Sequence, residues 1–474
     1  MQASFSSEFS LHHDHEPIVA LASSRGMGPI AVVRVSGPQC HGLLLPCLQR
    51  KGQVNEEKWP DRYLHYCHFI DPRSGEILDD PLVCFFSGPH SYTGQDSAEI
   101  YLHGSPYIIE TLIGILLRQG FRPAEAGEFT RRAFLQGKMD LSAAEGVREL
   151  LAASSHQQWL AARQLTSGKL HQAIDVLREA MVDAQAWLAA RIDFPDEKET
   201  SAVELHEVTS RVTRVSTAID QLLATYNSGQ VAQGGLKVAL VGEPNAGKST
   251  LLNTLLSKNR AIVSAQPGTT RDYLEESCLL EGRLLRLLDT AGLRETSCEI
   301  EQEGIKRSLE LARTAELVLL LIPRDSRAEV LREQIERLEH AGIAFQLVLT
   351  KGDLPLEPSL EQSLQQLASY EAIEISCQGE QGIGALKAFM IAHVDGYVQT
   401  VEGGVCISSV RHKVALEQAQ AALQRFFAAH AVGAYDELLA FELLEASEAL
   451  DSIVGKIAAD DILGAVFSTF CVGK

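Results

Sequence analysis

The stretch LKVALVGEPNAGKST, residues 236–250, limits the possible folds of this chain more than any other stretch does. An apolar run leads into GEPNAGKS, which matches the pattern G-x-x-x-x-G-K-[ST]. A strand, a glycine-rich loop and a helix in this order direct backbone N–H groups at a phosphate. We therefore expect a P-loop, with Lys248 reaching the β- and γ-phosphates of a nucleotide and the Ser249 hydroxyl binding Mg²⁺.

Alternating strand and helix patterns continue beyond this loop. Further apolar runs occur at LLRLLDT, ELVLLLIP, AFQLVLT and EAIEIS, and helical stretches separate them. This order predicts a mainly parallel sheet with helices on both faces, which ends near Val394. The helix after the P-loop is expected to begin at Lys248.

Two motifs that follow the P-loop are placed to contact the γ-phosphate. PGTTRD offers Thr270 as a second Mg²⁺ ligand. DTAG puts the Asp289 carboxylate at a strand end near the metal and the Gly292 amide near the γ-phosphate. The next residue is Leu293, whereas the best-known GTPases have a Gln there that orients the attacking water. The motif itself therefore does not say which group directs the water.

Two later motifs are placed to recognise guanine. In TKGD, Asp353 can accept hydrogen bonds from guanine N1–H and the exocyclic amine, which adenine lacks, so GTP is chosen over ATP. Lys351 is expected to lie against the base, and SCQ to offer a backbone N–H at Ser376 or Cys377 to the guanine carbonyl. Thr350 replaces the usual Asn and Cys377 the usual Ala. We expect both changes to weaken or retune guanine affinity without abolishing it, because Asp353 is kept.

Together these motifs predict the residues that contact GTP. Those of the P-loop and its helix are Asn245, Ala246, Gly247, Lys248, Ser249 and Thr250. Those of the next segment are Ser264, Ala265, Gln266, Pro267, Gly268, Thr269 and Thr270. The remaining ones are Asp289, Thr290, Ala291, Gly292, Lys351, Asp353, Ser376 and Cys377.

The flanking sequence has a different pattern. Residues 16–138 read as short strands separated by glycine and proline, and the pattern turns helical from about Asp140, where Ser142 and Glu145 are spaced as a capping box. Two apolar stripes with helical spacing follow, and the chain is helical again from about Ser408. The stripes are Ile174, Leu177, Met181, Ala184, Leu188 and then Val208, Val212, Val215, Ile219, Leu222, Tyr226. Helical sequence on both sides suggests an α/β unit inserted into a helical domain.

Composition excludes several classes of protein. A chain of 474 residues is expected to form two to four domains, and its net charge of -20 argues against a general nucleic-acid coat protein. A local basic patch around Arg131 and Arg132 could still contact RNA. Nine scattered cysteines without a C-x-x-C pair argue against a disulfide framework and a zinc site. Without a secretory signal or a membrane-length apolar run, we expect a cytoplasmic protein.

The motifs PNAGKST, PGTTRD and DTAGLRE, with VRVSG and EFTRRAFLQGKMDL near the start and FCVGK at the end, resemble the bacterial tRNA modification GTPases called MnmE or TrmE. The resemblance covers essentially the whole chain after the first fifteen or so residues. It implies an N-terminal α+β folate-binding and dimerisation domain at 1–138. It also implies a helical domain at 139–234 and 397–474, interrupted by an inserted P-loop GTPase α/β domain at 235–396.

The resemblance also implies an activity and partners. Members form homodimers and act with an FAD-dependent MnmG-type partner in a heterotetramer or larger complex. They add an aminomethyl or carboxymethylaminomethyl group to C5 of the tRNA wobble uridine, using 5,10-methylene- or 5-formyl-tetrahydrofolate. By motif match, Arg34, Glu99 and Lys138 line the folate pocket and Lys474 approaches it. For Cys471 the resemblance leaves open a place near the folate or an inert chain end.

For catalysis, the resemblance implies that the G domains dimerise around K⁺, which replaces an arginine finger. Asn245 matches the K⁺-binding residue, and Ser264, Gln266 and Thr269 belong to the loop that completes the site. Glu301 matches the residue that positions the attacking water, so Glu301 and Lys248 are the expected catalytic residues.

Two alternatives remain open at this point. A ribosome-assembly GTPase has a similar G domain but needs an RNA-binding module, and no basic KH-like segment is recognised in the sequence. A non-hydrolysing nucleotide switch serving as a scaffold is the other, and Leu293 is its best argument.

Overall fold

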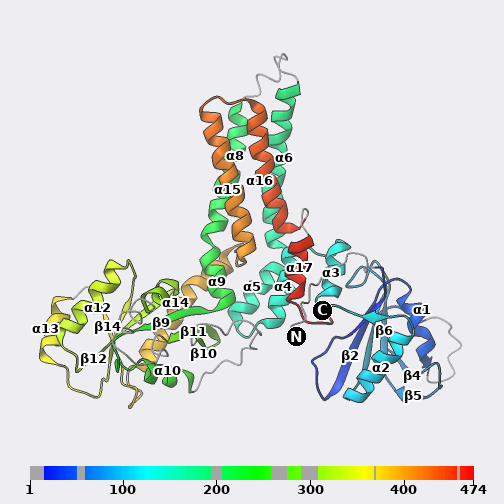
Figure 1. The fold of residues 1–474 in the computed structure, drawn as a ribbon, viewed down its shortest axis with the longest axis horizontal. Helices are drawn as coiled ribbons and strands as arrows, with labels where there is room; N and C mark the ends of the chain where they lie inside the picture. Colours follow the sequence, from blue (N-terminus) through cyan, green and yellow to red (C-terminus); the bar gives the residue numbers. More distant parts are fainter. Residues whose placement is uncertain are drawn as a thin grey trace, which may run out of the picture. The chain divides into compact units, whose positions relative to one another are not determined.

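The computed structural model describes residues 15–50, 59–193, 205–257, 275–289, 308–367, 370–455 and 460–474. Contacts divide the chain into two compact units, Met1–Arg148 with Asp451–Lys474, and Glu149–Leu450. The first combines a mixed sheet with helices, and the second combines long helices with a mainly parallel sheet (Figure 1). The fold class predicted from the sequence is confirmed. No helix of the described segments is long and apolar enough to cross a membrane.

The first unit is built on a largely antiparallel sheet in the order β3-β4-β6-β7-β2-β1-β8, with β5 paired to β4. Its strands are β1 (Ile18–Leu21), β2 (Gly28–Ser36), β3 (Leu48–Arg50), β4 (His65–Ile70), β5 (Ile77–Asp79), β6 (Leu82–Phe86), β7 (Ser97–Gly104) and β8 (Arg122–Pro123). Its helices are α1 (Cys40–Leu44), the 3-10 turn η2 (Leu45–Cys47), α2 (Pro106–Arg118), α3 (Glu128–Leu135), α4 (Leu141–Ala152) and α17 (Asp460–Ser468). Helix α4 continues into the second unit.

Alternation along β2 and β7 separates the core of this unit from a polar face. Val33 and Val35 of β2 and Ile100 of β7 are fully buried in one apolar cluster with α2. Arg34 and Glu99 are the intervening residues, and they lie opposite each other in the antiparallel register. Because successive side chains of a strand point to opposite faces, both side chains lie on the face away from α2.

The start of α4 differs from the predicted capping box. The Asp140 carboxylate, Oδ1, accepts a hydrogen bond of 2.9 Å from the Ala143 N–H. Ser142 lies inside the helix, and its hydroxyl donates to the Ile453 carbonyl at 3.1 Å. The capping box was therefore wrong by two residues, because Asp in the position before the helix satisfies the free N–H group equally well.

The prediction of a basic patch at Arg131 and Arg132 is also wrong. Both residues are buried, with exposed fractions of 4% for Arg131 and 1% for Arg132. Arg132 donates to Glu128 Oε1 at 2.8 Å, and Arg122 donates to the same oxygen at 2.6 Å. The Arg132 charge is therefore neutralised by Glu128 inside the unit, and neither buried arginine is available to RNA.

The helices of the second unit come from both sides of the P-loop sequence. They are α5 (His156–Thr166), α6 (Lys169–Asp193), α8 (Leu205–Ala224), α9 (Tyr226–Gly234), α14 (Ile383–Gly403), α15 (Val410–Ala431) and α16 (Asp436–Val454). Figure 1 shows α6, α8, α15 and α16 alongside one another. Gln420 of α15 donates to Ser216 and Asp220 of α8 at 2.9 and 3.0 Å. The apolar stripes of α6 and α8 are buried as predicted, except that Tyr226 begins the next helix.

The sheet of the second unit has the order β10-β11-β9-β12-β13-β14. The strands are β9 (Leu236–Val241), β10 (Glu275–Leu280), β11 (Arg283–Asp289), β12 (Leu317–Pro323), β13 (Gln346–Thr350) and β14 (Ala372–Glu374), and the adjoining helices are α10 (Lys248–Leu256), α12 (Ala328–His340) and α13 (Pro358–Gln366). All pairings are parallel except β10 with β11. The predicted parallel sheet and the start of α10 at Lys248 are confirmed, and β10 is an addition that the sequence reading missed.

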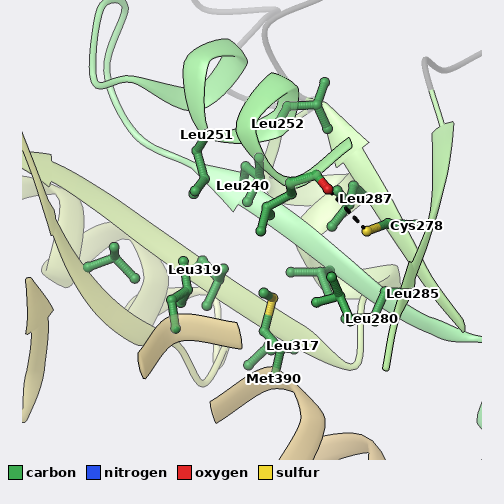
Figure 2. Close-up of a cluster of buried hydrophobic side chains, with 14 of the residues drawn as sticks. Leu240, Leu251, Leu252, Cys278, Leu280, Leu285, Leu287, Leu317, Leu319 and Met390 are labelled. Carbon is green, nitrogen blue, oxygen red and sulfur yellow. Dashed lines mark hydrogen bonds between the residues drawn. The ribbon is translucent and has the colours of Figure 1, made fainter. Parts of the chain in front are cut away.

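Both faces of this sheet are covered, which is why its strands are apolar throughout. Leu317 and Leu319 of β12 pack with α10 and α14 (Figure 2), whereas the intervening Val318 and Leu320 pack with α12 on the other face. The polar residues that follow β9, β12, β13 and β14 are thereby gathered at the carboxyl edge of the sheet.

Candidate functional site

The loop between β9 and α10 has the backbone of a phosphate-binding loop. Gly242, Asn245 and Gly247 have positive φ values of 154°, 66° and 92°. A Cβ at Gly242 would lie 2.5 Å from the Leu321 carbonyl oxygen, so the position excludes other residues. The Lys248 ammonium donates to the carbonyls of Gly242 at 2.6 Å and Glu243 at 2.8 Å. The lysine thus lies across the mouth of its own loop.

The other predicted P-loop ligands are accessible. Asn245, Ser249 and Thr250 are exposed, while Ala246 is buried under the loop. Within the described segments, the Ser249 hydroxyl has no hydrogen-bond partner from the protein. A hydroxyl oxygen at the first turn of α10 that is exposed in this way is free to bind a hard cation such as Mg²⁺.

Thr350 ties the guanine motif to the P-loop, a contact that the sequence reading missed. Its hydroxyl donates to the Ala246 carbonyl at 2.8 Å, across 104 positions of the chain. The residue is buried, at 3% exposure, at the end of β13. The two loops that the sequence assigns to phosphate and base therefore form one assembly.

Lys351 has a left-handed backbone, with φ 57°, and its ammonium lies 3.1 and 3.2 Å from the two carboxylate oxygens of Asp325. Asp325 follows β12, the strand that pairs with β13. Sequence reasoning missed it as well. Its place after a strand that neighbours β13 was the signal that could have identified it.

Asp353 is held by a neighbouring motif. The Ser376 hydroxyl donates to Asp353 Oδ1 at 2.7 Å, and this bond holds the pKa of the Asp353 carboxyl below its ordinary value. The Ser376 N–H in turn donates to Gln381 O at 2.9 Å. Asp353 is exposed, so a charged carboxylate of fixed orientation faces solvent. Burial raises the pKa of the adjacent Cys377 thiol, so that residue is a neutral side chain here.

The remaining predicted nucleotide contacts are only partly described. Asp289 ends β11, with its backbone opposite Leu240 of β9. The other predicted contacts lie outside the described residues: Ser264, Ala265, Gln266, Pro267, Gly268, Thr269, Thr270, Thr290, Ala291, Gly292 and the proposed catalytic Glu301.

The first unit contains a pocket of about 320 Å³ around Arg34 and Glu99. Its lining residues are Arg34, Phe86, Tyr92, Thr93, Ser97, Glu99, Val147 and Lys474. Arg34 donates to Glu99 Oε1 from Nε at 3.0 Å and from Nη2 at 2.6 Å. Tyr101 donates to the other carboxylate oxygen at 2.6 Å. These contacts fix one carboxylate and one guanidinium side by side in a partly apolar pocket.

The charges of the pocket influence one another. Burial alone raises the pKa of Glu99, but the hydrogen bonds from Tyr101 and Arg34 outweigh it and leave this pKa below its usual value. The Glu99 carboxylate raises the pKa of Tyr101 to about 12. Burial and the neighbouring Arg34 charge lower the pKa of Lys474. Glu99 is therefore ionised and ready to accept hydrogen bonds at neutral pH.

The C-terminal residues reach this pocket along a fixed path. Val472 forms an antiparallel bridge with Ala126. A Cβ at Gly473 would lie 2.3 Å from the Leu21 carbonyl oxygen, so only glycine fits there. Lys474 then lines the pocket, while Cys471 is exposed.

Lys138, the fourth residue expected in the pocket, is not among the lining side chains. Its ammonium donates to the Pro89 carbonyl at 2.9 Å and so contacts the segment between β6 and β7. That segment also carries Tyr92 and Thr93, which do line the pocket. Lys138 thus contacts the loop rather than the pocket itself.

Comparisons with known proteins cover both units. A family profile described as GTP-binding protein TrmE N-terminus matches residues 17–138, and one described as MnmE helical domain matches residues 141–471. The tRNA modification GTPase MnmE of Syntrophus aciditrophicus (strain SB) is 37% identical over 97% of this chain and 99% of its own. The tRNA modification GTPase MnmE of Natranaerobius thermophilus is 36% identical over 97% of this chain and 99% of its own.

Among solved structures, the G domain of the FeoB iron transporter of T. maritima is 25% identical over 33% of this chain and 98% of its own, with a TM-score of 0.25. That likeness adds nothing to the assignment. The profile matches and the full-length relatives together show that this chain belongs to the MnmE family of tRNA modification GTPases.

Proposed function

We propose that this chain binds and hydrolyses GTP as an enzyme of tRNA modification. The observation that best supports this proposal is the hydrogen bond by which Thr350 joins the P-loop to the guanine motif, in a single assembly at the carboxyl edge of the second sheet. In that assembly Asp353 is ionised, exposed and oriented by Ser376. A carboxylate of this kind matches the two adjacent donors of guanine and meets no such pair on adenine.

Turnover of GTP and ATP by the full chain tests this proposal. We expect GTP to be hydrolysed with a kcat/KM on the order of 100-fold or more above that of ATP, because an unsatisfied carboxylate rejects adenine. Lys248→Ala is expected to remove activity, since its ammonium lies at the phosphate loop. Lys169→Ala, an exposed lysine on α6, is the matched control. Equal use of GTP and ATP would overturn the proposed role of Asp353.

The proposed metal ligands are Ser249 and Thr270 for Mg²⁺, and Asn245, Ser264, Gln266 and Thr269 for K⁺. The accessible hydroxyl of Ser249 and the exposed, left-handed Asn245 fit cation binding at the loop. When bound, the two cations supply positive charge against the phosphate oxygens. Glu301 is proposed to orient the attacking water, which Leu293 cannot do. Lys248 is proposed to leave the carbonyls of its own loop for the phosphates.

The pocket around Arg34 and Glu99 is proposed to hold a tetrahydrofolate derivative. Its volume of about 320 Å³ lies at the lower end of ligand pockets, which suits a ring system rather than a whole cofactor. Glu99 accepts donors of the ring, and Lys474 attracts a ligand's negative charge. The folate supplies a one-carbon unit when bound. Lys138 stays a proposed ligand only if its ammonium leaves the Pro89 carbonyl.

The remaining assignments rest on family membership. We propose a cytoplasmic homodimer formed through residues 1–138, with domain boundaries as predicted at 138, 234 and 396. Its proposed partner is FAD-dependent, and their product is the C5-modified wobble uridine of tRNA. Family membership also favours this function over ribosome assembly or a non-hydrolysing switch. Light scattering of the purified chain with and without the partner tests the assembly.

A further inference from the structure

We propose that this protein reads guanine without a side-chain contact from residue 350 to N7, because Thr350 uses its only hydroxyl proton to hold the P-loop. The inference rests on the proposed binding of GTP and concerns how the same site distinguishes the base. It follows from the Thr350 contact, from the Lys351 ion pair and from the number of protons that each side chain offers.

Thr350 lies between the phosphate and base ends of the site. Its hydroxyl is 2.8 Å from the Ala246 carbonyl, and its side chain approaches within 3.7 Å of the point where a Cβ of Gly247 would lie. Asp353, which is proposed to accept from N1–H and the amine of guanine, is three residues further along. In this proposed binding mode, the five-membered ring of guanine, which carries N7 and bonds the ribose, is placed between Asp353 and the P-loop, over Thr350.

The protons available there are few. A threonine hydroxyl has one proton, and in this protein it is donated to Ala246. Guanine N7 and O6 are acceptors only, so each needs a donor. The neighbouring Lys351 ammonium directs two of its three protons at the carboxylate oxygens of Asp325. An Asn at residue 350 would offer two N–H groups, so it could hold the loop and still donate to the base.

The consequence is that the site should tolerate a change at N7 of the purine but not a change at the edge that faces Asp353. 7-Deaza-GTP has a C–H group in place of N7 and keeps the groups that face Asp353, so it should bind as tightly as GTP. ITP lacks the exocyclic amine and should bind about 3- to 10-fold more weakly, because Asp353 loses one hydrogen bond. The base would thus be distinguished at its Watson–Crick edge and not at N7.

Competition against a fluorescent guanine nucleotide, using the full chain, measures the three Kd values. For the native protein and for Thr350→Ser, which keeps the hydroxyl, we expect GTP and 7-deaza-GTP to agree within about 2-fold. For Thr350→Asn, the added donor should favour GTP over 7-deaza-GTP by about 3- to 10-fold. The ratio of two ligands on one protein is insensitive to a general loss of stability. If Thr350→Asn fails to fold, the native protein and Thr350→Ser still decide.

The outcomes separate the inference from the function beneath it. A native preference for GTP over 7-deaza-GTP of 3-fold or more, with ITP weaker than GTP, would overturn the inference and leave GTP recognition standing. Equal binding of GTP and ITP would overturn the proposed role of Asp353. No binding of GTP would overturn the proposed function and this inference with it.

Discussion

Glu128 provides a direct test of how the first unit is held together. The residue is 1% exposed, and its carboxylate receives hydrogen bonds from Arg122 at 2.6 and 2.8 Å and from Arg132 at 2.8 and 3.2 Å. The Glu125 N–H donates a further bond at 2.9 Å. Glu128→Gln removes the charge while keeping the size of the side chain. It leaves Arg132, also 1% exposed, without its counter-charge.

The magnitude can be worked from the same contacts. Burial opposes the charged form, but bonds from Arg122, Glu125 and Arg132 outweigh it and lower the pKa of Glu128 from 4.5 to about 2. At roughly 1.4 kcal/mol per pKa unit, this corresponds to about 3–4 kcal/mol of stability at neutral pH. Removing one partner of a buried ion pair typically costs about 3–5 kcal/mol. We therefore expect Glu128→Gln to destabilise the unit by about 3–5 kcal/mol.

Urea unfolding of a protein that keeps Trp59 as its only tryptophan measures this loss of stability. Trp59 lies in the first unit, and its ring contacts Phe85 edge-on at 5.6 Å, so its fluorescence reports local unfolding. Trp159→Phe and Trp187→Phe silence the other two. The matched control is Glu16→Gln, which removes a half-exposed partner of the same Arg122, at 2.8 Å. An exposed pair contributes about 0–1 kcal/mol, so the control should change little.

The dependence on pH provides a second check with a definite sign. The pKa of Glu128 is lowered in the folded protein, so its stabilisation is complete above the unfolded pKa near 4.5 and is lost as pH falls toward 2. The difference between native protein and Glu128→Gln should therefore be constant above pH 5 and shrink below pH 4.5. If Glu128→Gln lowers the free energy of unfolding at pH 7 no more than Glu16→Gln does, the buried Glu128 carboxylate does not hold the unit together.

Further predictions concern the two sites. Glu301→Ala should lower kcat for GTP by about 100-fold or more with a nearly unchanged Kd, because orientation of the attacking water is lost; unchanged turnover removes Glu301 from the mechanism. GTP hydrolysis should be much faster in KCl than in NaCl at equal ionic strength, and equal rates contradict the proposed role of Asn245. Glu99→Gln should weaken binding of 5-formyl-tetrahydrofolate about 10-fold or more, measured by calorimetry. Lys138→Ala should change the affinity for 5-formyl-tetrahydrofolate little. A loss of affinity equal to that of Glu99→Gln would show that the Lys138 ammonium contacts the ligand.

Much of the fold follows from short-range sequence patterns. The P-loop, the parallel strands and the buried stripes of α6 and α8 depend on residues that are close in the chain. Arg34 and Glu99 are similar, since each lies between buried apolar residues of a strand. Alternation therefore places both on the polar face before any tertiary contact is known.

The features that the sequence did not reveal depend on distant contacts. The Thr350 hydroxyl and the Ala246 carbonyl are 104 positions apart, and the Lys351–Asp325 pair joins two loops. Arg132 reads as a surface charge until the buried Glu128 carboxylate, which also binds Arg122, is seen to neutralise it. Side-chain pairing of this kind has no periodicity, so only the assembled structure identifies it.

The proposed function as a whole is tested most directly in cellular tRNA. Nucleosides of tRNA from cells that lack this protein are compared with those from cells supplied with the native chain or with Lys248→Ala. We expect the C5-modified wobble uridine to disappear without the protein, to return with the native chain and not to return with Lys248→Ala. Normal wobble uridines in cells without the protein would contradict the proposed function.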